Sequence, residues 1–306
     1  MSNVKFGLNY KLIYETKNEK GETQQKVEIF NEDGDFGLTC DFEIKRSYQS
    51  QLNKSYFRIY NLSPSTRSKM ARDRYDALNY SKIEFYLGYG KQLYLVFSGN
   101  ALITESKYLN QTDAITTIEA LDGSFLTYNS YSNFSVNENT TYQYIFDKFV
   151  KDLKNKASEV KDNFSMELLT ADAKTELKNK RIAKKMTFAG NTWEEMKKLF
   201  GEGLFIDNNK INYLPLKAKN NKAVFVASAE TGLLNIPQLS NAILTLDMIC
   251  EPSVQVGDMA EIRTTRENRF ANKQCKIFGI SHAGTISKTV GTEATTTLDL
   301  GRFNIT

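Results

Sequence analysis

The last third of the chain combines apolar runs with proline and glycine turns, and this combination most restricts the fold. Asn241–Pro252 is a mostly apolar run that ends at a proline, and Val254–Asp258 follows as a turn around Gly257. A second apolar run, Gln274–Gly284, contains the single histidine, His282. Proline lacks the N–H that a sheet ladder needs, and glycine takes the positive φ that tight turns need. The pattern predicts a buried strand, two turns and another strand.

The first 130 residues also favour strands. The chain holds 16 Tyr and 19 Phe, and both side chains suit a half-buried pleated surface. Ser63 and Pro64 have the order of an N-cap and a first helical residue, which predicts a short helix that ends near residue 74. Gly88 and Gly90 predict a hairpin turn. The strand candidates are residues 4–15, 27–30, 38–48, 56–60, 82–87, 93–97, 100–108 and 114–121.

The middle of the chain changes to helical spacing. Thr140 or Thr141 is placed to cap a helix, and Thr192 with Glu195 predicts a capping box at the start of a second helix. Asn208-Asn209 predicts a tight hairpin, because asparagine tolerates positive φ. The Lys-rich residues 155–186 predict an exposed helical or loop insertion. Apolar residues on one face of the first helix are Tyr142, Ile145, Phe146, Phe149, Val150 and Leu153.

The last third resembles the C-terminal barrel of baseplate hub proteins from contractile-tailed bacteriophages. A strand that ends in Tyr60-Asn-Leu-Ser63, followed directly by a short helix, resembles the first barrel of the same family. The hub portion of type VI secretion spike proteins shares this architecture. The residues that carry the main resemblance are Gly232, Leu233, Pro237, Pro252, Gly257, His282 and Gly284.

The resemblance implies an α+β fold, mainly β, with two tail-tube-like antiparallel β-barrel domains and a small α+β module between them. We expect the first barrel in residues 1–135, the module with its Lys-rich insertion in 136–225, and the second barrel in 226–306. The apolar residues Leu244, Leu246, Met248 and Ile277 are predicted to share one barrel core. The turn at Gly257 and the strand end at His282 and Gly284 are predicted at its rim.

The resemblance also implies a function in assembly. Such a hub is a homotrimeric ring that joins the hexameric tail tube, or a tube-initiator protein, to the trimeric cell-puncturing spike. Baseplate wedge and tape measure proteins are further partners that the resemblance suggests. DNA passes through the lumen without specific binding. The expected location is the tail baseplate of a virion that is assembled in the bacterial cytoplasm.

The sequence predicts no catalytic site, cofactor or metal. His282 is the single histidine, which removes sites built on several His ligands, and a structural His at a strand end fits the resemblance better than a base. The carboxylate pairs Asp33/Asp35, Asp41/Glu43, Glu194/Glu195 and Glu230/Asp247 fit no pattern that forces two carboxyl groups across a cleft. The alternatives are a tail-associated cell-wall or polysaccharide hydrolase, and a distal tail or tube-initiator protein.

Charge and cysteine usage agree with an assembly protein made in a reducing compartment. The net charge is only +4, so a nucleic-acid-binding domain is not favoured, and the Lys cluster at 174–185 is best read as a solvated helix face. The three cysteines, Cys40, Cys250 and Cys275, lie in apolar runs and predict buried free thiols. No apolar stretch approaches the roughly 20 residues of a membrane span, so we expect no membrane anchor.

Overall fold

The computed structural model describes residues 5, 7–18, 20–31, 37–49, 52–72, 80–159, 161, 165–168, 170–201, 203–216, 218, 223–235, 237–241, 243–263 and 274–301. The first part, here called the N-terminal sheet region, contains these elements: β1 Leu8–Lys17, β2 Thr23–Phe30, β3 Cys40–Ser47, β4 Lys54–Tyr60, α1 Pro64–Met70, β5 Tyr80–Tyr89, β6 Gln92–Tyr108 and β7 Ala114–Leu121.

Two further parts follow along the chain. The module contains α2 Ser124–Asn129, β8 Tyr131–Val136, α3 Tyr142–Glu159, β9 Ser165–Leu168, α4 Ala171–Asn179, β10 Met186–Asn191, α5 Thr192–Phe200, β11 Leu204–Asp207 and β12 Lys210–Tyr213. The C-terminal sheet region contains β13 Phe225–Ala227, a short 3₁₀ helix at Ala229–Thr231, β14 Gln238–Ser240, β15 Ile243–Ile249, β16 Met259–Ile262, β17 Gln274–Ile286 and β18 Glu293–Gly301.

One 13-stranded sheet runs through both sheet regions in the described part of the chain. Its main order is β14-β15-β18-β17-β3-β4-β7-β6-β5-β1-β2, with β16 beside β17 and β13 beside β16. The regions join where β3 pairs antiparallel with β17, from Cys40 opposite Ile286 to Ser47 opposite Gly279. The prediction of a mainly β, α+β fold is confirmed. The division into two barrels, and the domain boundaries drawn at residues 135 and 225, stay predictions.

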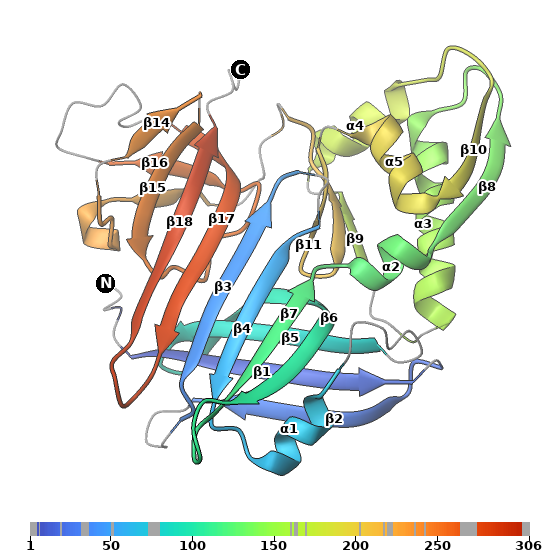
Figure 1. Cartoon of the computed structure of the whole chain (residues 1–306). Coiled ribbons are helices and arrows are strands. Elements are labelled where there is room, and N and C mark those ends of the chain that lie inside the picture. The colour runs from blue at the N-terminus through green and yellow to red at the C-terminus, as the bar shows by residue number, and fades with distance from the viewer. Residues whose placement is uncertain are drawn as a thin grey trace.

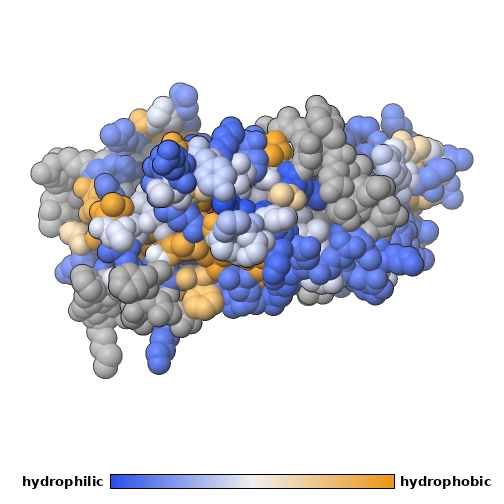
Figure 2. Space-filling view, turned by 60° about the horizontal axis from the view of Figure 1, so that its bottom comes forward, coloured by the Kyte–Doolittle hydropathy of each residue, from blue (hydrophilic) through white to orange (hydrophobic). Residues whose placement is uncertain are grey.

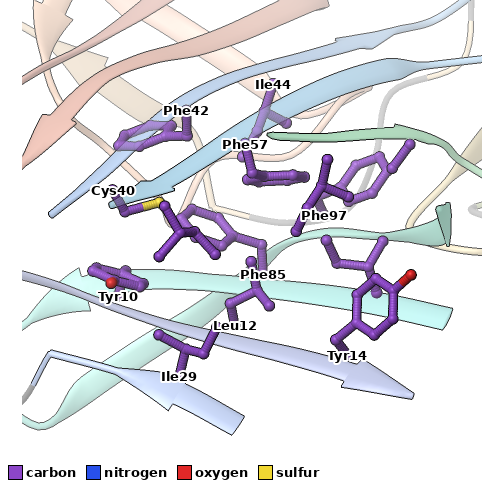
Figure 3. Close-up of a cluster of buried hydrophobic side chains, with 14 of the residues drawn as sticks. Tyr10, Leu12, Tyr14, Ile29, Cys40, Phe42, Ile44, Phe57, Phe85 and Phe97 are labelled. Atoms are coloured by element: carbon purple, nitrogen blue, oxygen red, sulfur yellow. The ribbon is translucent and has the colours of Figure 1, made fainter. Parts of the chain in front are cut away.

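The N-terminal sheet region folds over its own core. In Figure 1, β1 and β2 cross beneath the ends of β3 and β4 at a steep angle. Figure 3 shows Tyr10 and Leu12 of β1 pointing toward Phe42 of β3 and Phe57 of β4, with Phe85 of β5 between them. The Phe57 and Phe85 rings lie 4.8 Å apart between centroids. Because β1, β3, β4 and β5 alternate buried and more exposed residues, one face of each fills this core.

Each of the other parts has a separate core. The module core contains the predicted face of α3, with Ile145, Phe146, Phe149, Val150 and Leu153 buried, and it also contains Leu126 of α2 and Val136 of β8. The predicted residues Leu244, Leu246, Met248 and Ile277 lie together in the core of the C-terminal sheet region.

The helix caps confirm one expectation and correct another. Ser63 caps α1 and accepts from the Thr66 amide at 3.2 Å, as predicted. Thr192 does not cap α5. The N-cap is Asn191, whose side chain accepts from the Glu194 amide at 3.1 Å. Strand β10 runs directly into the helix, so Thr192 is fully buried and its hydroxyl lies 3.0 Å from Ser132 Oγ.

The Lys-rich stretch is more ordered than an exposed insertion. It supplies the end of α3, β9 and α4, and it buries Ala173, Leu177 and Ile182 in the module core. The lysines lie on the outer side, where long charged side chains stay solvated. A helix with solvated lysines is as expected, but the buried contribution to the module core was not predicted. Apolar residues four and five apart among lysines define a narrow buried stripe.

Candidate functional site

The seven residues of the family resemblance are distributed over the C-terminal sheet region. Gly232 and Leu233 border β15, because the Ile249 amide donates to Gly232 O at 2.8 Å and Leu233 bridges Met248. Pro237 is buried just before β14, and Pro252 is buried just after β15. They therefore occupy separate turns and strand ends.

Gly257 makes the predicted turn between β15 and β16. Its φ is +88°, and a Cβ at this position would lie 2.7 Å from Leu214 Cδ2. The turn is closed because the Gly257 amide donates to Ile277 O at 2.9 Å. The positive φ therefore favours glycine, and any side chain here would also have to displace the Leu214 methyl group.

His282 does not lie at a rim. It sits inside β17, opposite Ile44 of β3 and Thr296 of β18, and is fully buried. Nδ1 is 2.8 Å from Thr296 Oγ1, which also accepts from the Glu251 amide, and Nε2 has no hydrogen-bond partner among the described residues. Burial, with the nearby Arg46 charge, lowers the pKa of His282 to about 3. The histidine is therefore neutral at physiological pH.

Gly284 lies in the same strand, two residues before the strand ends at Ile286. A Cβ there would lie 2.3 Å from Glu293 O, so β18 approaches too closely for a side chain. The strand continues past both residues to Ile286, which explains why the motif reads as a strand end in the sequence and lies inside the sheet in the fold.

The most developed polar site, here called the polar junction, lies where the three parts meet. Arg46 on β3 donates from Nε to Asp207 Oδ1 at 2.7 Å and from Nη2 to Asp207 Oδ2 at 2.5 Å. Its Nη1 donates to Val254 O at 3.4 Å. Burial opposes the Arg46 charge, but the attraction of Asp207 outweighs it and holds the pKa of Arg46 above its ordinary value. One side chain thus links both sheet regions to the module.

A second group at the polar junction holds the tip of the β11–β12 hairpin. Asn208 and Asn209 have φ of +56° and +58°, so the predicted turn is confirmed. Their amides donate to the Asp122 carboxyl oxygens at 2.7 and 2.6 Å. Burial, and then repulsion by Asp207, raise the pKa of Asp122 to about 8. Asn53 adds a hydrogen bond of 2.8 Å from Nδ2 to Ile206 O.

A third group holds the chain that leaves the hairpin. Lys276 on β17 is 1% exposed, and its Nζ donates to the backbone oxygens of Pro215, Leu216 and Ala218 at 3.1 to 3.3 Å. The same ammonium lies 4.4 Å from the Tyr48 ring centroid, and Tyr48 donates to Leu214 O. Burial lowers the pKa of Lys276 to about 7.

Apart from the Asn208-Asn209 turn, the residues of the polar junction were not predicted from the sequence, although one signal was present. Arg46 continues the alternation of Cys40, Phe42 and Ile44, so it falls on the buried face of β3. A charged residue in register with a core face needs a buried partner. The partner Asp207 follows the buried Leu204–Ile206 run, but nothing in the sequence joins it to β3, which is 161 residues away.

The candidate catalytic carboxylates are engaged elsewhere. Asp41 accepts from Tyr60 and Thr285, and Asp247 accepts from Asn235 and Thr297. Glu43 pairs with Lys45, Glu194 with Lys197 and Glu195 with Lys198, whereas Glu230 is exposed. Asp33 and Asp35 lie outside the described residues. Among the described members of these pairs, each carboxylate except Glu230 is thus held by its own hydrogen bonds or ion pair.

The described residues contain neither a metal-binding cluster nor a membrane-spanning helix. No group of three or more His, Cys, Asp or Glu side chains lies close enough together there to hold a metal ion. No helix in those residues is both long and apolar enough to cross a membrane. The three cysteines are free and buried, and burial raises the pKa of Cys250 to about 12.

The two end strands of the sheet, β14 and β2, each have one edge without a partner strand among the described residues. β14 pairs only with β15 and β2 only with β1 in the described sheet, and Gln238, Leu239 and Ser240 are exposed. Figure 2 turns the lower end of Figure 1 toward the reader and shows apolar side chains gathered near the middle of that face, among hydrophilic ones. Exposed apolar residues of the N-terminal sheet region include Phe30, Tyr94, Tyr108 and Leu109.

No family model and no curated protein matches this sequence. Solved structures do share the fold. The 43 kDa tail protein of prophage MuSo2 from Shewanella oneidensis is 7% identical with a TM-score of 0.60, over 95% of this chain and 96% of its own. The c3393 protein of E. coli, a type VI secretion component similar to the T4 bacteriophage tail proteins gp27 and gp5, is 12% identical with a TM-score of 0.54, over 87% and 73%.

A VgrG complex has the same fold in a longer chain. The Francisella PdpA–VgrG complex aligns at 8% identity and a TM-score of 0.60 over 98% of this chain, but over only 53% of that chain. The chain therefore shares its fold with phage tail proteins, a type VI secretion component and a chain of a VgrG complex, and the resemblance drawn from the sequence is confirmed at that level.

Proposed function

We propose that the chain is a structural hub of a phage contractile tail. Three copies form a ring that joins the tail tube, or a tube-initiator protein, to the central spike, with wedge and tape measure proteins as further partners. The observation that carries this proposal is the fold shared over nearly the whole length of a phage tail protein. The location follows as the virion tail, assembled in the bacterial cytoplasm, and DNA passes through the ring without specific binding.

The open ends of the sheet support a ring. An unpaired strand edge presents free N–H and C=O groups, which a neighbouring copy satisfies when the ring closes. β14 and β2 lie at opposite ends of the sheet order, so a head-to-tail contact can repeat from copy to copy. Each copy would contribute two tube-like β units, so three copies would match a hexameric tube.

The test measures mass and shape together. Mass photometry at micromolar protein is expected to give about three times the 34.9 kDa chain mass, and negative-stain images a ring with a channel. Leu239→Lys places a charge on the β14 edge and should lower the trimer fraction without lowering Tm. Val290→Lys makes the same change at a 79% exposed residue between β17 and β18, away from both edges, and should leave the trimer intact.

Two results would contradict the hub. The first result is a chain that stays monomeric both in solution and in intact tails, which would contradict the trimeric ring. Turnover of peptidoglycan that disappears with one carboxylate variant would instead support the hydrolase, whereas we expect no turnover because the candidate carboxylates are held in separate hydrogen bonds and ion pairs.

A further inference from the structure

The Arg46–Asp207 ion pair is almost closed to water. The Arg46 side chain is 1% exposed and the Asp207 side chain 11%. Taking both charges out of water costs several kcal/mol, which their attraction roughly repays, so such a pair contributes little net stability. The contacts around it already provide apolar packing, because the Tyr48 and Phe205 rings lie 5.1 Å apart between centroids. A role other than stability therefore has to explain the pair.

We propose that Arg46 is a positioning residue that sets the orientation of the module against the sheet. Its guanidinium makes two parallel hydrogen bonds to one carboxylate, and such a fork fixes both distance and direction. Apolar side chains packed side by side tolerate small rotations, whereas the fork does not. The third bond, to Val254 O, ties the same planar group to the C-terminal sheet region.

The other contacts at the polar junction do not fix the register of the module against the sheet in this way. Asn53, Asp122 and Lys276 bind backbone atoms of residues 206–218, and every residue carries such atoms. These contacts stabilise the backbone shape of the hairpin, but they do not depend on which side chain occupies each position. In the Arg46 contact, a side chain recognises a side chain, because a shift by one residue would replace the Asp207 carboxylate by Ile206 or Asn208.

The consequence for assembly rests on the proposed function. The contact surfaces of neighbouring copies in a closed ring must meet at a fixed angle. A module that adopts several orientations therefore lowers the fraction of copies that can join the ring. The orientation itself, in contrast, is a property of one chain. It can be measured whether or not the ring forms.

The experiment measures distances between spin labels in the full chain. Labels go on Lys178→Cys in α4, Gln24→Cys in β2 and Gln238→Cys in β14, which replace exposed residues, while the native cysteines are buried. The variant Arg46→Met with Asp207→Leu removes both charges and keeps apolar volume. The matched control, Glu194→Leu with Lys197→Met, removes an exposed module ion pair whose atoms are 2.7 Å apart.

The double variant should keep its Tm while the 178–24 and 178–238 distance distributions become roughly twice as broad. Arg46→Lys keeps a charge but loses the fork, and should broaden the same two distributions. The 24–238 distance should stay narrow in every variant, and the control should match the wild type. Distributions as narrow as the wild type would overturn the proposal. An unfolded double variant would also overturn it, because the pair would then act in stability.

Ring formation is measured separately from the spin-label distances. Trimer fraction is measured by mass photometry on unlabelled chains of each variant, because the labels at 24 and 238 lie on the two edge strands, and it should fall in the double variant and not in the control. A wild-type chain that is monomeric contradicts the proposed ring but leaves the distance result intact. A wild-type ring that forms equally well from a variant with broad distances contradicts the assembly consequence alone.

Discussion

His282 shows how one buried residue makes the fold sensitive to acid. Its folded pKa is about 3, below the value of about 6.5 for an exposed histidine, so the folded state binds fewer protons between these limits. The stabilising contribution is therefore present above pH 6.5 and is lost as the pH falls toward 3. At pH 4.5 the loss reaches about 2–3 kcal/mol.

The variant His282→Gln tests this directly, since glutamine can still bond to Thr296 but does not titrate. We expect wild type to lose about 2 kcal/mol more than His282→Gln between pH 7 and 4.5 in urea unfolding. Carboxylates titrate in both proteins and cancel in the comparison. Equal losses would mean that His282 is protonated without cost in the folded chain.

Asp122 gives the opposite dependence between pH 3.8 and about 8. Its folded pKa is about 8 and the exposed value is 3.8, so the folded state holds a proton that the unfolded state releases. Stability is then lost as the pH rises through 8, by about 2–3 kcal/mol between pH 6 and 8. Asp122→Asn should remove that loss. Lys276 has a lowered pKa and stabilises with rising pH above 7, but it is present in both chains. Parallel curves for wild type and Asp122→Asn would contradict the prediction.

The residues of the polar junction also show what could not be predicted from the sequence at the scale of single residues. Buried apolar side chains follow from alternation, as in β3, but the partner of a buried charge depends on distant contacts. Lys276 lies between Cys275 and Ile277 in β17 and looks like an outward residue. It is buried because Pro215, Leu216 and Ala218 lie against its ammonium group, and no local sequence pattern predicts this contact.

Among the elements, α5 depends on a cap that the sequence pattern misassigned. Asn191 satisfies the Glu194 amide, whereas Glu195 pairs with Lys198 on the helix surface. Asn191→Ala should cost about 1 kcal/mol in urea unfolding, and Glu195→Ala less than about 0.5 kcal/mol. The reverse order would restore the capping box at Thr192 and Glu195.

The turn at Gly257 is the element-scale position with the least tolerance. Valine there would need a positive φ and would contact Leu214, so Gly257→Val should destabilise by more than about 2 kcal/mol. Lys178→Ala on the exposed side of α4 should change stability by less than about 0.5 kcal/mol. Yields of soluble protein and urea midpoints compare the two variants. Equal values would contradict the turn assignment.

Elements were the most predictable level of this structure. Most strand candidates, the start of α1 at Ser63, the α3 face and the Asn208-Asn209 hairpin follow from short-range rules. The candidates at 93–97 and 100–108 instead form one strand, β6, and α1 ends at Met70 and not near residue 74. The failures at α5 and His282 share a cause. At α5, β10 enters the helix without a loop and moves the cap by one residue, and at His282 the strand runs past its apparent end because β3 and β18 both pair with it.

The whole molecule could not be read from local patterns, because distant segments complete its sheet and cores. β3 pairs with β17 across more than 230 residues of sequence, and the core of the N-terminal sheet region includes Cys250 and Ile286 from the last third. Alternation locates the buried face of a strand, but it does not name its neighbour. The family resemblance predicted the general architecture, but it did not predict that one sheet runs through both sheet regions.

This shared sheet leads to a prediction for the predicted first domain, residues 1–135, produced alone. The fragment lacks β17, so the β3 edge is open, and its core lacks Cys250 and Ile286. An open, half-apolar edge invites pairing between copies. We therefore expect the fragment to self-associate at micromolar concentration and to unfold at a lower temperature than the full chain, measured by light scattering and circular dichroism.

Adding the missing strand separates this cause from a general loss of stability. A peptide of residues 274–301 carries β17 and β18 and should return the fragment to a monodisperse complex, because β17 then covers β3. A peptide of residues 238–249 carries β14 and β15, which do not pair with β3, and should have no effect. A fragment that is monomeric and as stable as the full chain would show that the first region is an independent domain, and that the β3–β17 ladder only docks two finished units.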